Sequence, residues 1–303
     1  MSHNNTVFSQ LLKLIPRHEF EVLAKQHHSG RSFRTATRWS QFVTMAMGQL
    51  AGRSSLRDIV ENISAQAHRL YHLGGAKLSR SNLSRINEDN PYALYEALFG
   101  KLLHRCQAIA PRHHFRFNNL LYSLDASTID LCLSVFPWAD FRTTKGAIKL
   151  HVGLNHNGYL PEFVTVTEGK EHDVTIGRTL KFPKGSIVAI DKGYNDYTWY
   201  KRLTDKGIFF VTRLKTNAAF RVISRRSVLK DKGLTSDQTI EFSGIQTAKK
   251  CPTQLRRIGY RDAQTGKHYT FLTNNFKLSA STIADIYKAR WQVNYSLNGL
   301  NKT

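Results

Sequence analysis

The chain has 303 residues, 41% of them hydrophobic, and no apolar run reaches the roughly 18–20 residues of a membrane helix, so we expect one or two globular domains and no membrane span. Its 44 Lys and Arg residues against 22 Asp and Glu residues give a net charge of +22, which favours a nucleic-acid partner over a ribosome-associated or membrane-surface role. Three widely spaced cysteines, Cys106, Cys132 and Cys251, argue against a disulfide framework or a zinc site and suggest a cytoplasmic protein with reduced thiols. With a nucleic-acid partner, we expect this protein to be nucleoid-associated.

The first 65 residues have the apolar periodicity of helices. Pro16 separates the first helix from the second, and another helix is expected over about 39–50. A basic cluster precedes this last helix, and its side chains are candidate DNA contacts. The cluster contains Arg31, Arg34 and Arg38.

Residues 76–90 predict a short helix capped by Ser79. Arg80 and Arg85 would contact DNA phosphates and Asn82 would reach a base edge, as in the recognition helix of a helix-turn-helix. An ordinary capped surface helix has the same pattern, so both interpretations stay open. An apolar helix then begins near Pro91, and residues 1–110 together predict an all-α DNA-binding module.

From about residue 119 the periodicity becomes that of strands separated by turns. Three strands, a helix at 173–180, a strand, a helix at 196–206 and another strand follow, and this order predicts an α/β fold with a ribonuclease-H-like mixed sheet over residues 118–303. Residues 214–270 are basic and turn-rich with short strands, and a last helix begins near Thr282. The main strands are expected at 120–124, 147–154, 163–166, 186–190 and 208–213, and shorter ones at 220–223, 239–242, 255–260 and 269–273.

Two of the main strands end in a carboxylate, Asp125 and Asp191. The first and fourth strands can lie side by side in the predicted order, which would bring these residues together. A buried carboxylate is costly unless another charge compensates it, and a shared divalent cation would do so. Oxygen ligands favour Mg²⁺, with Mn²⁺ as the alternative. Carboxylates that hold such metals catalyse phosphoryl transfer, so we predict a metal site here.

Other residues compete for a place in this site. Asp130 lies further along the first strand, Asp140 in an apparent loop, and Asp173 resembles a helix N-cap. His151 and His172 could act as general acids or bases, but substrate or structural contacts explain them more readily. The sequence contains no Ser-His-Asp spacing, phosphate-binding glycine loop or His-Glu-x-x-His motif.

Three motifs together resemble the IS4-type DDE transposases of bacterial insertion sequences: Ser-Leu-Asp125-Ala-Ser, Ala-Ile-Asp191-Lys-Gly-Tyr194 and Tyr287-Lys-Ala-Arg290-Trp-Gln. The resemblance covers most of the chain. It implies a ribonuclease-H-like catalytic domain with a β-rich insertion, here residues 214–270. It also implies metal-dependent DNA strand cleavage and transfer, with terminal inverted repeats and target DNA as partners and a homodimer on paired DNA ends.

The last family motif is Tyr, two residues, Arg, three residues, Glu, six residues and Lys. Tyr287 and Arg290 match it, but Asn294 stands at the Glu position and Asn301 at the Lys position. The resemblance therefore implies the catalytic set Asp125, Asp191, Tyr287 and Arg290 without a third carboxylate. A neutral amide leaves the metals under-neutralised, so we expect weak or no catalysis, with DNA binding retained.

Residues 293–303 also fit a single-nucleotide frameshift. Deleting one G from codons for Val-Glu-Leu-Phe-Phe-Lys-Trp-Ile-Lys-Gln-Asn reproduces every residue of this tail, and the undeleted peptide has Glu at 294 and Lys at 301. We therefore expect a transposase whose last catalytic helix is incomplete. One alternative is a non-catalytic DNA-binding protein or inhibitor derived from a transposase, which Asn294 favours. Another is a structure-selective nuclease, against which the separate basic helical module argues.

Overall fold

A computed structural model describes residues 6–29, 36–53, 55–131, 140–142, 145–228 and 232–290. The chain divides into two compact units, the first made by the helices up to residue 108 and the second by residues 109–298. None of the described helices is long and apolar enough to cross a membrane. Cys106 is exposed and Cys251 buried, both as free thiols, and Cys132 lies outside the described residues.

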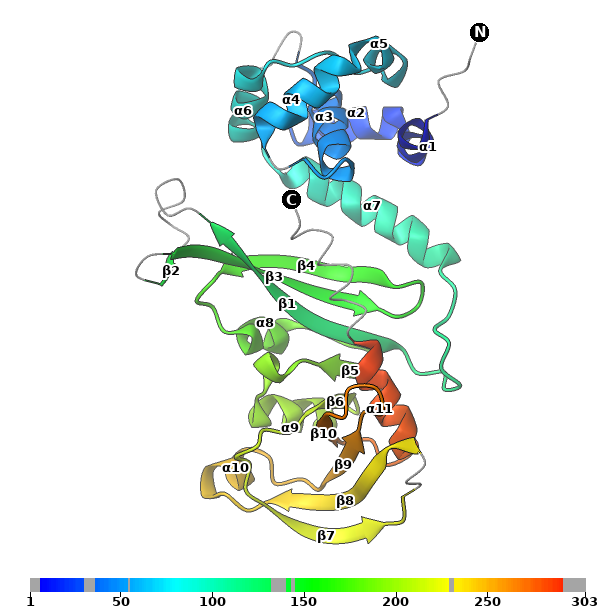
Figure 1. The fold of residues 1–303 in the computed structure, drawn as a ribbon, viewed down its shortest axis with the longest axis vertical. Helices are drawn as coiled ribbons and strands as arrows, with labels where there is room; N and C mark the ends of the chain where they lie inside the picture. Colours follow the sequence, from blue (N-terminus) through cyan, green and yellow to red (C-terminus); the bar gives the residue numbers. More distant parts are fainter. Residues whose placement is uncertain are drawn as a thin grey trace. The chain divides into compact units, whose positions relative to one another are not determined.

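The first unit is helical, as predicted (Figure 1). Several of its helices start where a hydroxyl side chain accepts a backbone N–H, for example Thr37 from Ser40 at 3.1 Å and Ser79 from Asn82 at 3.2 Å. The helices are α1 (Val7–Lys13), α2 (Arg17–Gln26), α3 (Arg38–Leu50), α4 (Leu56–Ala65), α5 (Ala67–Leu70), the 3₁₀ turn η1 (Tyr71–Leu73), α6 (Arg80–Asp89) and α7 (Ala93–Ile109).

These helices enclose an apolar core. Phe20 on α2 packs edge-on against Trp39 on α3, with ring centroids 5.0 Å apart. α6 contributes Leu83 and Ile86, which are fully buried and three positions apart on one helix face. Its basic residues therefore point away from this core.

The second unit is built on one sheet, in which the described residues form ten strands (Figure 1). The order is β2-β3-β1-β5-β6-β10-β9-β8-β7, with β4 paired to β3. β1, β5 and β6 are parallel to one another, and the other pairs are antiparallel. The strands are β1 (Leu121–Leu131), β2 (Asp140–Arg142), β3 (Lys145–Asn155), β4 (Leu160–Glu168), β5 (Ile187–Ile190), β6 (Phe209–Arg213), β7 (Phe220–Arg226), β8 (Leu234–Phe242), β9 (Leu255–Arg261) and β10 (His268–Thr273).

Helices cover both faces of the central strands. Because alternate residues of a strand point to opposite faces of the sheet, each central strand contributes side chains to two cores. Leu124 and Ile190 belong to the core that contains α9, whereas Leu121 and Ile187 belong to the core that contains α11. The helices of this unit are α8 (Asp173–Thr179), the 3₁₀ turn η2 (Lys192–Tyr194), α9 (Tyr197–Asp205), α10 (Ile245–Lys250) and α11 (Ala280–Ala289).

The mixed α/β sheet and the order of its main strands confirm the sequence prediction. Three details differ. Asp140 lies in strand β2 and not in a loop, and the helix α10 was not expected. The predicted insertion at 214–270 continues the sheet beyond β10, because β9, β8 and β7 pair in succession.

Candidate active site

The two predicted strand-end carboxylates do come together. β1 and β5 are parallel neighbours, with Leu124 opposite Ile190. Asp125 and Asp191 each follow one of these paired residues, so they occupy equivalent places on adjacent chains. The prediction that the first and fourth strands lie side by side is therefore confirmed.

The position of Asp125 differs from the expectation that it ends its strand. β1 continues to Leu131 as an antiparallel partner of β3, whereas its parallel pairing with β5 stops at Leu124. Asp125 therefore lies where one edge of β1 loses its neighbour while the other edge stays paired. This arrangement keeps its backbone paired with β3 and leaves its other edge open next to Asp191.

Arg290, just after α11, joins the two carboxylates. Its Nη1 donates to Asp125 Oδ1 at 2.9 Å, and its Nη2 lies 3.0 Å from Asp191 Oδ1. The side chains of Arg290 and Asp125 are 3% and 8% exposed, and that of Asp191 is 28% exposed. A buried guanidinium thus supplies the charge that the buried Asp125 and the partly exposed Asp191 require.

Two more side chains reach Asp191. The hydroxyl of Tyr287 donates to Asp191 Oδ1 at 3.5 Å, and Arg213 Nη2 lies 3.7 Å from the same oxygen. The Arg213 guanidinium also lies over the ring of Tyr287, 5.8 Å from its centroid. Sequence reasoning missed Arg213. The available signal was its place at the end of β6, the strand next to β5.

The electrostatic environment of Asp125 is that of a buried acid. Burial raises the pKa of its carboxyl to about 6, Arg290 opposes this shift, and the nearby charge of Asp191 adds to it. A cation placed between the two carboxylates would favour their ionised forms. The geometry therefore suits a site that accepts positive charge.

Comparison with known proteins identifies the family of the second unit. A family model described as the transposase DDE domain matches residues 118–293, more than half of the chain. The chain belongs to this family. A second model, described as a domain of unknown function (DUF4372), matches residues 3–76.

Two relatives agree with this assignment. The candidate transposase y4zB of Sinorhizobium fredii is 29% identical over 215 residues, which are 70% of this chain and 59% of the relative. The probable transposase for insertion sequence element IS5377 of Geobacillus stearothermophilus is 26% identical over 298 residues, 97% of this chain and 75% of the relative. The chain thus spans about three fifths of the first relative and three quarters of the second.

Two carboxylates of the DDE domain have the chemistry of metal ligands. Asp125 and Asp191 provide the hard oxygen atoms that Mg²⁺ or Mn²⁺ prefers, and Mg²⁺ usually leaves its other positions to water and substrate. In the described part of the chain no group of three or more Asp, Glu, His or Cys residues forms a metal cluster. Asn294 and Asn301 lie outside the described residues.

His151 contacts the residues around Asp125 as a structural residue. It is fully buried, and its Nδ1 and Nε2 lie 3.0 Å from Tyr194 Oη and 2.9 Å from Thr167 Oγ1. Tyr194 in turn donates to the backbone carbonyl of Asp125 at 3.2 Å. Burial lowers the pKa of His151 and so favours its neutral form, and its hydrogen bonds support the strand that carries the carboxylate.

Asp173 also differs from its expected role as an N-cap. It is the first residue of α8, which His172 precedes as a cap residue without a side-chain bond. Asp173 Oδ1 pairs with Lys149 Nζ at 3.1 Å, and its Oδ2 would lie only 2.4 Å from a Cβ at Gly193. The glycine after Asp191 therefore allows this ion pair to lie against the site. The side chains of Asp130 and Asp140 lie outside the described set.

The predicted DNA-contacting residues of the first unit differ in their surroundings. Arg80 and Arg85 line an open hollow of about 740 Å³ together with Arg57 from α4, whereas Asn82 does not line it. Arg38 instead donates to the carbonyl of Pro91 at 2.9 Å inside the unit. Arg31 and Arg34 lie outside the described residues. The remaining lining residues of the hollow are Ser55, Leu56, Ser81, Ser84 and Glu88.

Proposed function

We propose that this protein acts on DNA as an IS4-type transposase, with a ribonuclease-H-like second unit that cleaves and transfers the strands of an insertion sequence. The observation that carries the proposal is the pair of carboxylates on adjacent parallel strands, Asp125 and Asp191, joined by Arg290. The match of the transposase DDE domain to residues 118–293 supports it. The partners would be the terminal inverted repeats and the target DNA, held by a homodimer.

Asp125 and Asp191 would hold Mg²⁺, or Mn²⁺, which activates water or a 3′-hydroxyl and stabilises the leaving oxygen when bound. The positively charged arginine side chains near these carboxylates would have a different role. Arg213 and Arg290 converge on Asp191 beside the hydroxyl of Tyr287. Arg290 is buried and would hold the two carboxylates in place, whereas the side chain of Arg213 is 35% exposed and suits the oxygens of a phosphate group. Arg213 would therefore orient the DNA backbone at the carboxylates.

The first unit would supply the DNA contacts outside the site. Arg57, Arg80 and Arg85 project into one hollow from two helices. Serine residues line the same hollow, and this combination is typical of contacts to the phosphate backbone. Arg31, Arg34, Arg38 and Asn82 remain proposed contacts from the sequence, although Arg38 already holds Pro91.

We further propose that catalysis by this chain is impaired. The motif's third carboxylate position holds Asn294, whose neutral oxygen cannot balance the charge of the metals. The frameshift hypothesis explains this residue and Asn301 together, because the peptide encoded one frame away has Glu and Lys at those positions. DNA binding without cleavage, as in an inhibitor of intact copies, is the alternative function that Asn294 favours.

A cleavage assay tests both proposals. The purified chain is incubated with Mg²⁺ or Mn²⁺ and duplexes that carry the sequences flanking its own gene. We expect binding without nicking. A variant in which the Glu-containing peptide replaces residues 294–303 should nick the duplex, and Asp125→Asn in that variant should abolish nicking. Nicking by the unaltered chain would contradict the impairment, and inactivity of the repaired chain would contradict the proposed transposase chemistry.

A further inference from the structure

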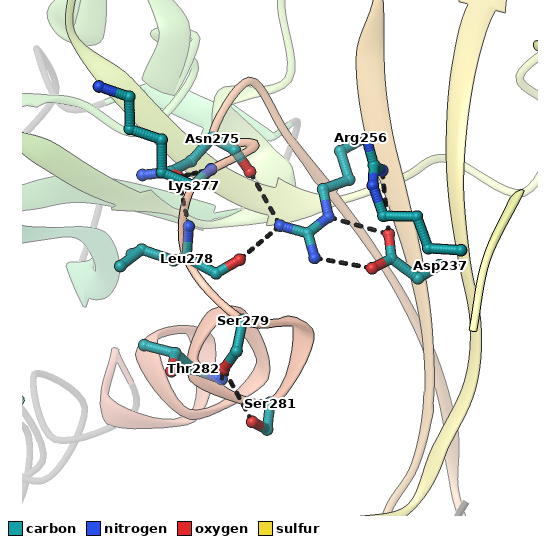
Figure 2. Close-up of polar contacts among 9 residues, drawn as sticks. Asp237, Arg256, Asn275, Lys277, Leu278, Ser279, Ser281 and Thr282 are labelled. Atoms are coloured by element: carbon teal, nitrogen blue, oxygen red, sulfur yellow. Dashed lines mark hydrogen bonds and ion pairs between the residues drawn. The ribbon is translucent and has the colours of Figure 1, made fainter. Parts of the chain in front are cut away.

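A buried ion pair lies where the extended part of the sheet meets the start of α11 (Figure 2). Arg256 on β9 and Asp237 on β8 are each 4% exposed. Arg256 Nε donates to Asp237 Oδ1 at 2.9 Å, and its Nη2 donates to Oδ2 at 2.7 Å. The pair is therefore bidentate, which fixes the orientation of the guanidinium plane.

The same guanidinium holds the segment that leads into α11. Its Nη1 donates to the carbonyls of Asn275 at 3.2 Å and Leu278 at 2.6 Å. Asn275 Oδ1 accepts from the backbone N–H groups of Lys277 and Leu278, both at 3.0 Å. Ser279 then caps the helix by accepting from Thr282 N at 3.1 Å (Figure 2). A continuous set of directional bonds thus connects β8 and β9 to the first turn of α11.

Apolar packing alone would fix α11 less closely. Its buried residues, such as Ile283 and Ile286, press it against the sheet, but hydrophobic contact has no directional preference. A helix of this length, ten residues, extends about 15 Å, so a tilt of about 5° at its start moves its far end by roughly 1 Å. At that end Arg290 makes contacts of 2.9 and 3.0 Å. A shift of about 1 Å would lengthen them beyond hydrogen-bonding distance.

We propose that Arg256 is a positioning residue: it fixes the start of α11 and thereby the place of Arg290 at the two carboxylates. This inference rests on the proposed function in one respect, namely that Arg290 belongs to the active site. It gives the strands beyond β10 a part in the site, because β8 and β9 supply both members of the ion pair.

A double-mutant cycle with Asp125→Asn and Arg290→Gln tests this proposal. The unfolding equilibrium constants of the four chains give the coupling between the two side chains, measured by urea without metal or DNA. In the otherwise unaltered protein we expect a coupling of about 10-fold or more. In an Arg256→Lys background it should fall to about 2-fold or less. Lysine keeps the charge opposite Asp237, but one amino group cannot hold a carboxylate and two carbonyls together.

The matched control is Arg221→Lys, because Arg221 also joins two neighbouring strands, pairing with Glu241 at 2.6 Å between β7 and β8, and its hydrogen bonds in the described part of the chain go to Glu241 and not to the segment before α11. This control should leave the coupling unchanged. If Arg256→Lys lowers stability but preserves the coupling, Arg256 is merely structural and the proposal is wrong. Should Arg256→Lys fail to fold, Asp237→Asn is put through the same cycle, with the same loss of coupling expected and unchanged coupling again decisive against the proposal. Failure of DNA cleavage would not alter these results, because the cycle contains no DNA.

Discussion

The arginines of α6 are exposed, whereas the two arginines that contact the ends of α11, one from β9 and one just after the helix, are buried. Arg80 and Arg85 line an open hollow and have no ion pair among the described residues. Arg256 and Arg290 are buried against carboxylates at 2.7–3.0 Å. An exposed arginine contributes little to folding and stays available to a polyanion, whereas a buried one is already committed to its acids.

This difference in burial predicts different effects when an arginine is removed from each region. Removing a buried arginine leaves carboxylates without their counter-charge, so stability falls before any ligand is considered. Removing an exposed arginine should change the affinity for DNA and leave the fold intact. Substitution of the buried arginines should therefore lower stability, whereas substitution of the exposed arginines of the first unit should lower DNA affinity.

The largest effect is expected for Arg290→Gln. Glutamine leaves Asp125 and Asp191 as adjacent, partly buried acids, and loss of one partner of a buried ion pair typically costs about 3–5 kcal/mol. Urea unfolding at neutral pH measures the loss. Mn²⁺ should restore part of it, because a cation that binds only the folded state stabilises that state. A loss below about 1 kcal/mol would show that the acids do not depend on this guanidinium.

A buried histidine offers a comparison with the buried arginines, because its hydrogen-bond partner is a neutral hydroxyl and not a carboxylate. His156 is fully buried, and its Nε2 lies 2.6 Å from Ser123 Oγ. Burial lowers its pKa from 6.5 to about 4, with His113 and His114 adding to the shift. The unfolded chain therefore binds the proton more readily, so stability is complete above pH 6.5 and is lost as the pH falls toward 4. The shift corresponds to about 3 kcal/mol.

Unfolding of the unaltered chain and of His156→Gln between pH 4 and pH 7 checks this prediction. The variant should lose a large part of the pH dependence in this range. His104→Gln is the control, because His104 is exposed, does not contribute to the shift at His156 and should leave the slope nearly unchanged. Equal slopes in all three proteins would show that another group controls the acid-sensitive step.

The sequence was sufficient to predict the carboxylate pair, for a reason that particular residues show. The apolar runs that end at Leu124 and Ile190 have the length and composition of buried strands, and the order of the elements makes them neighbours. Because side chains alternate, Leu124 faces the α9 core and Asp125 faces the side of α11. The place of Arg290 also followed from its motif.

The contacts of Arg213 and Arg256 could not be predicted in the same way. Each depends on pairing between segments distant in sequence. The end of the predicted strand at 208–213 was the one signal for Arg213, and nothing in the neighbouring residues marks Arg256 as different from the other basic residues of the chain. The length of β1 was underestimated for a related reason. Its second half follows β3 alone, and the polar residues there resemble a loop more than a strand.

The ion pair of Lys149 and Asp173 is intermediate, since its side chains are 18% and 20% exposed. Gly193→Ala would place a methyl carbon 2.4 Å from Asp173 Oδ2 and force the pair to move. We expect a loss of about 1–2 kcal/mol in the free energy of unfolding. Gly100→Ala is the control: its methyl group meets nothing within 4 Å, and alanine in a helix should be neutral or stabilising. Equal stability of the two variants would contradict the close packing at Gly193.

The smallest change in stability is expected for Arg57→Gln, Arg80→Gln and Arg85→Gln. Each should alter the free energy of unfolding by less than about 0.5 kcal/mol, because none of these side chains has an ion pair in the described part of the chain. If each contacts one phosphate, each substitution should weaken binding to any duplex and reduce the slope of log affinity against log salt by about 1. Fluorescence anisotropy with a labelled duplex at several salt concentrations measures both quantities.

Arg105→Gln is the matched control, since Arg105 is also exposed in the first unit but is paired with Glu19. Its removal should leave the salt slope unchanged, because this arginine lies outside the hollow. If Arg105→Gln reduced the slope as much as Arg80→Gln, the basic charge of the whole unit would govern binding and not the hollow between α4 and α6. If none of the four variants changed the slope, the DNA contacts would lie elsewhere in the chain, and exposure alone would not identify the arginines that are free for a polyanion.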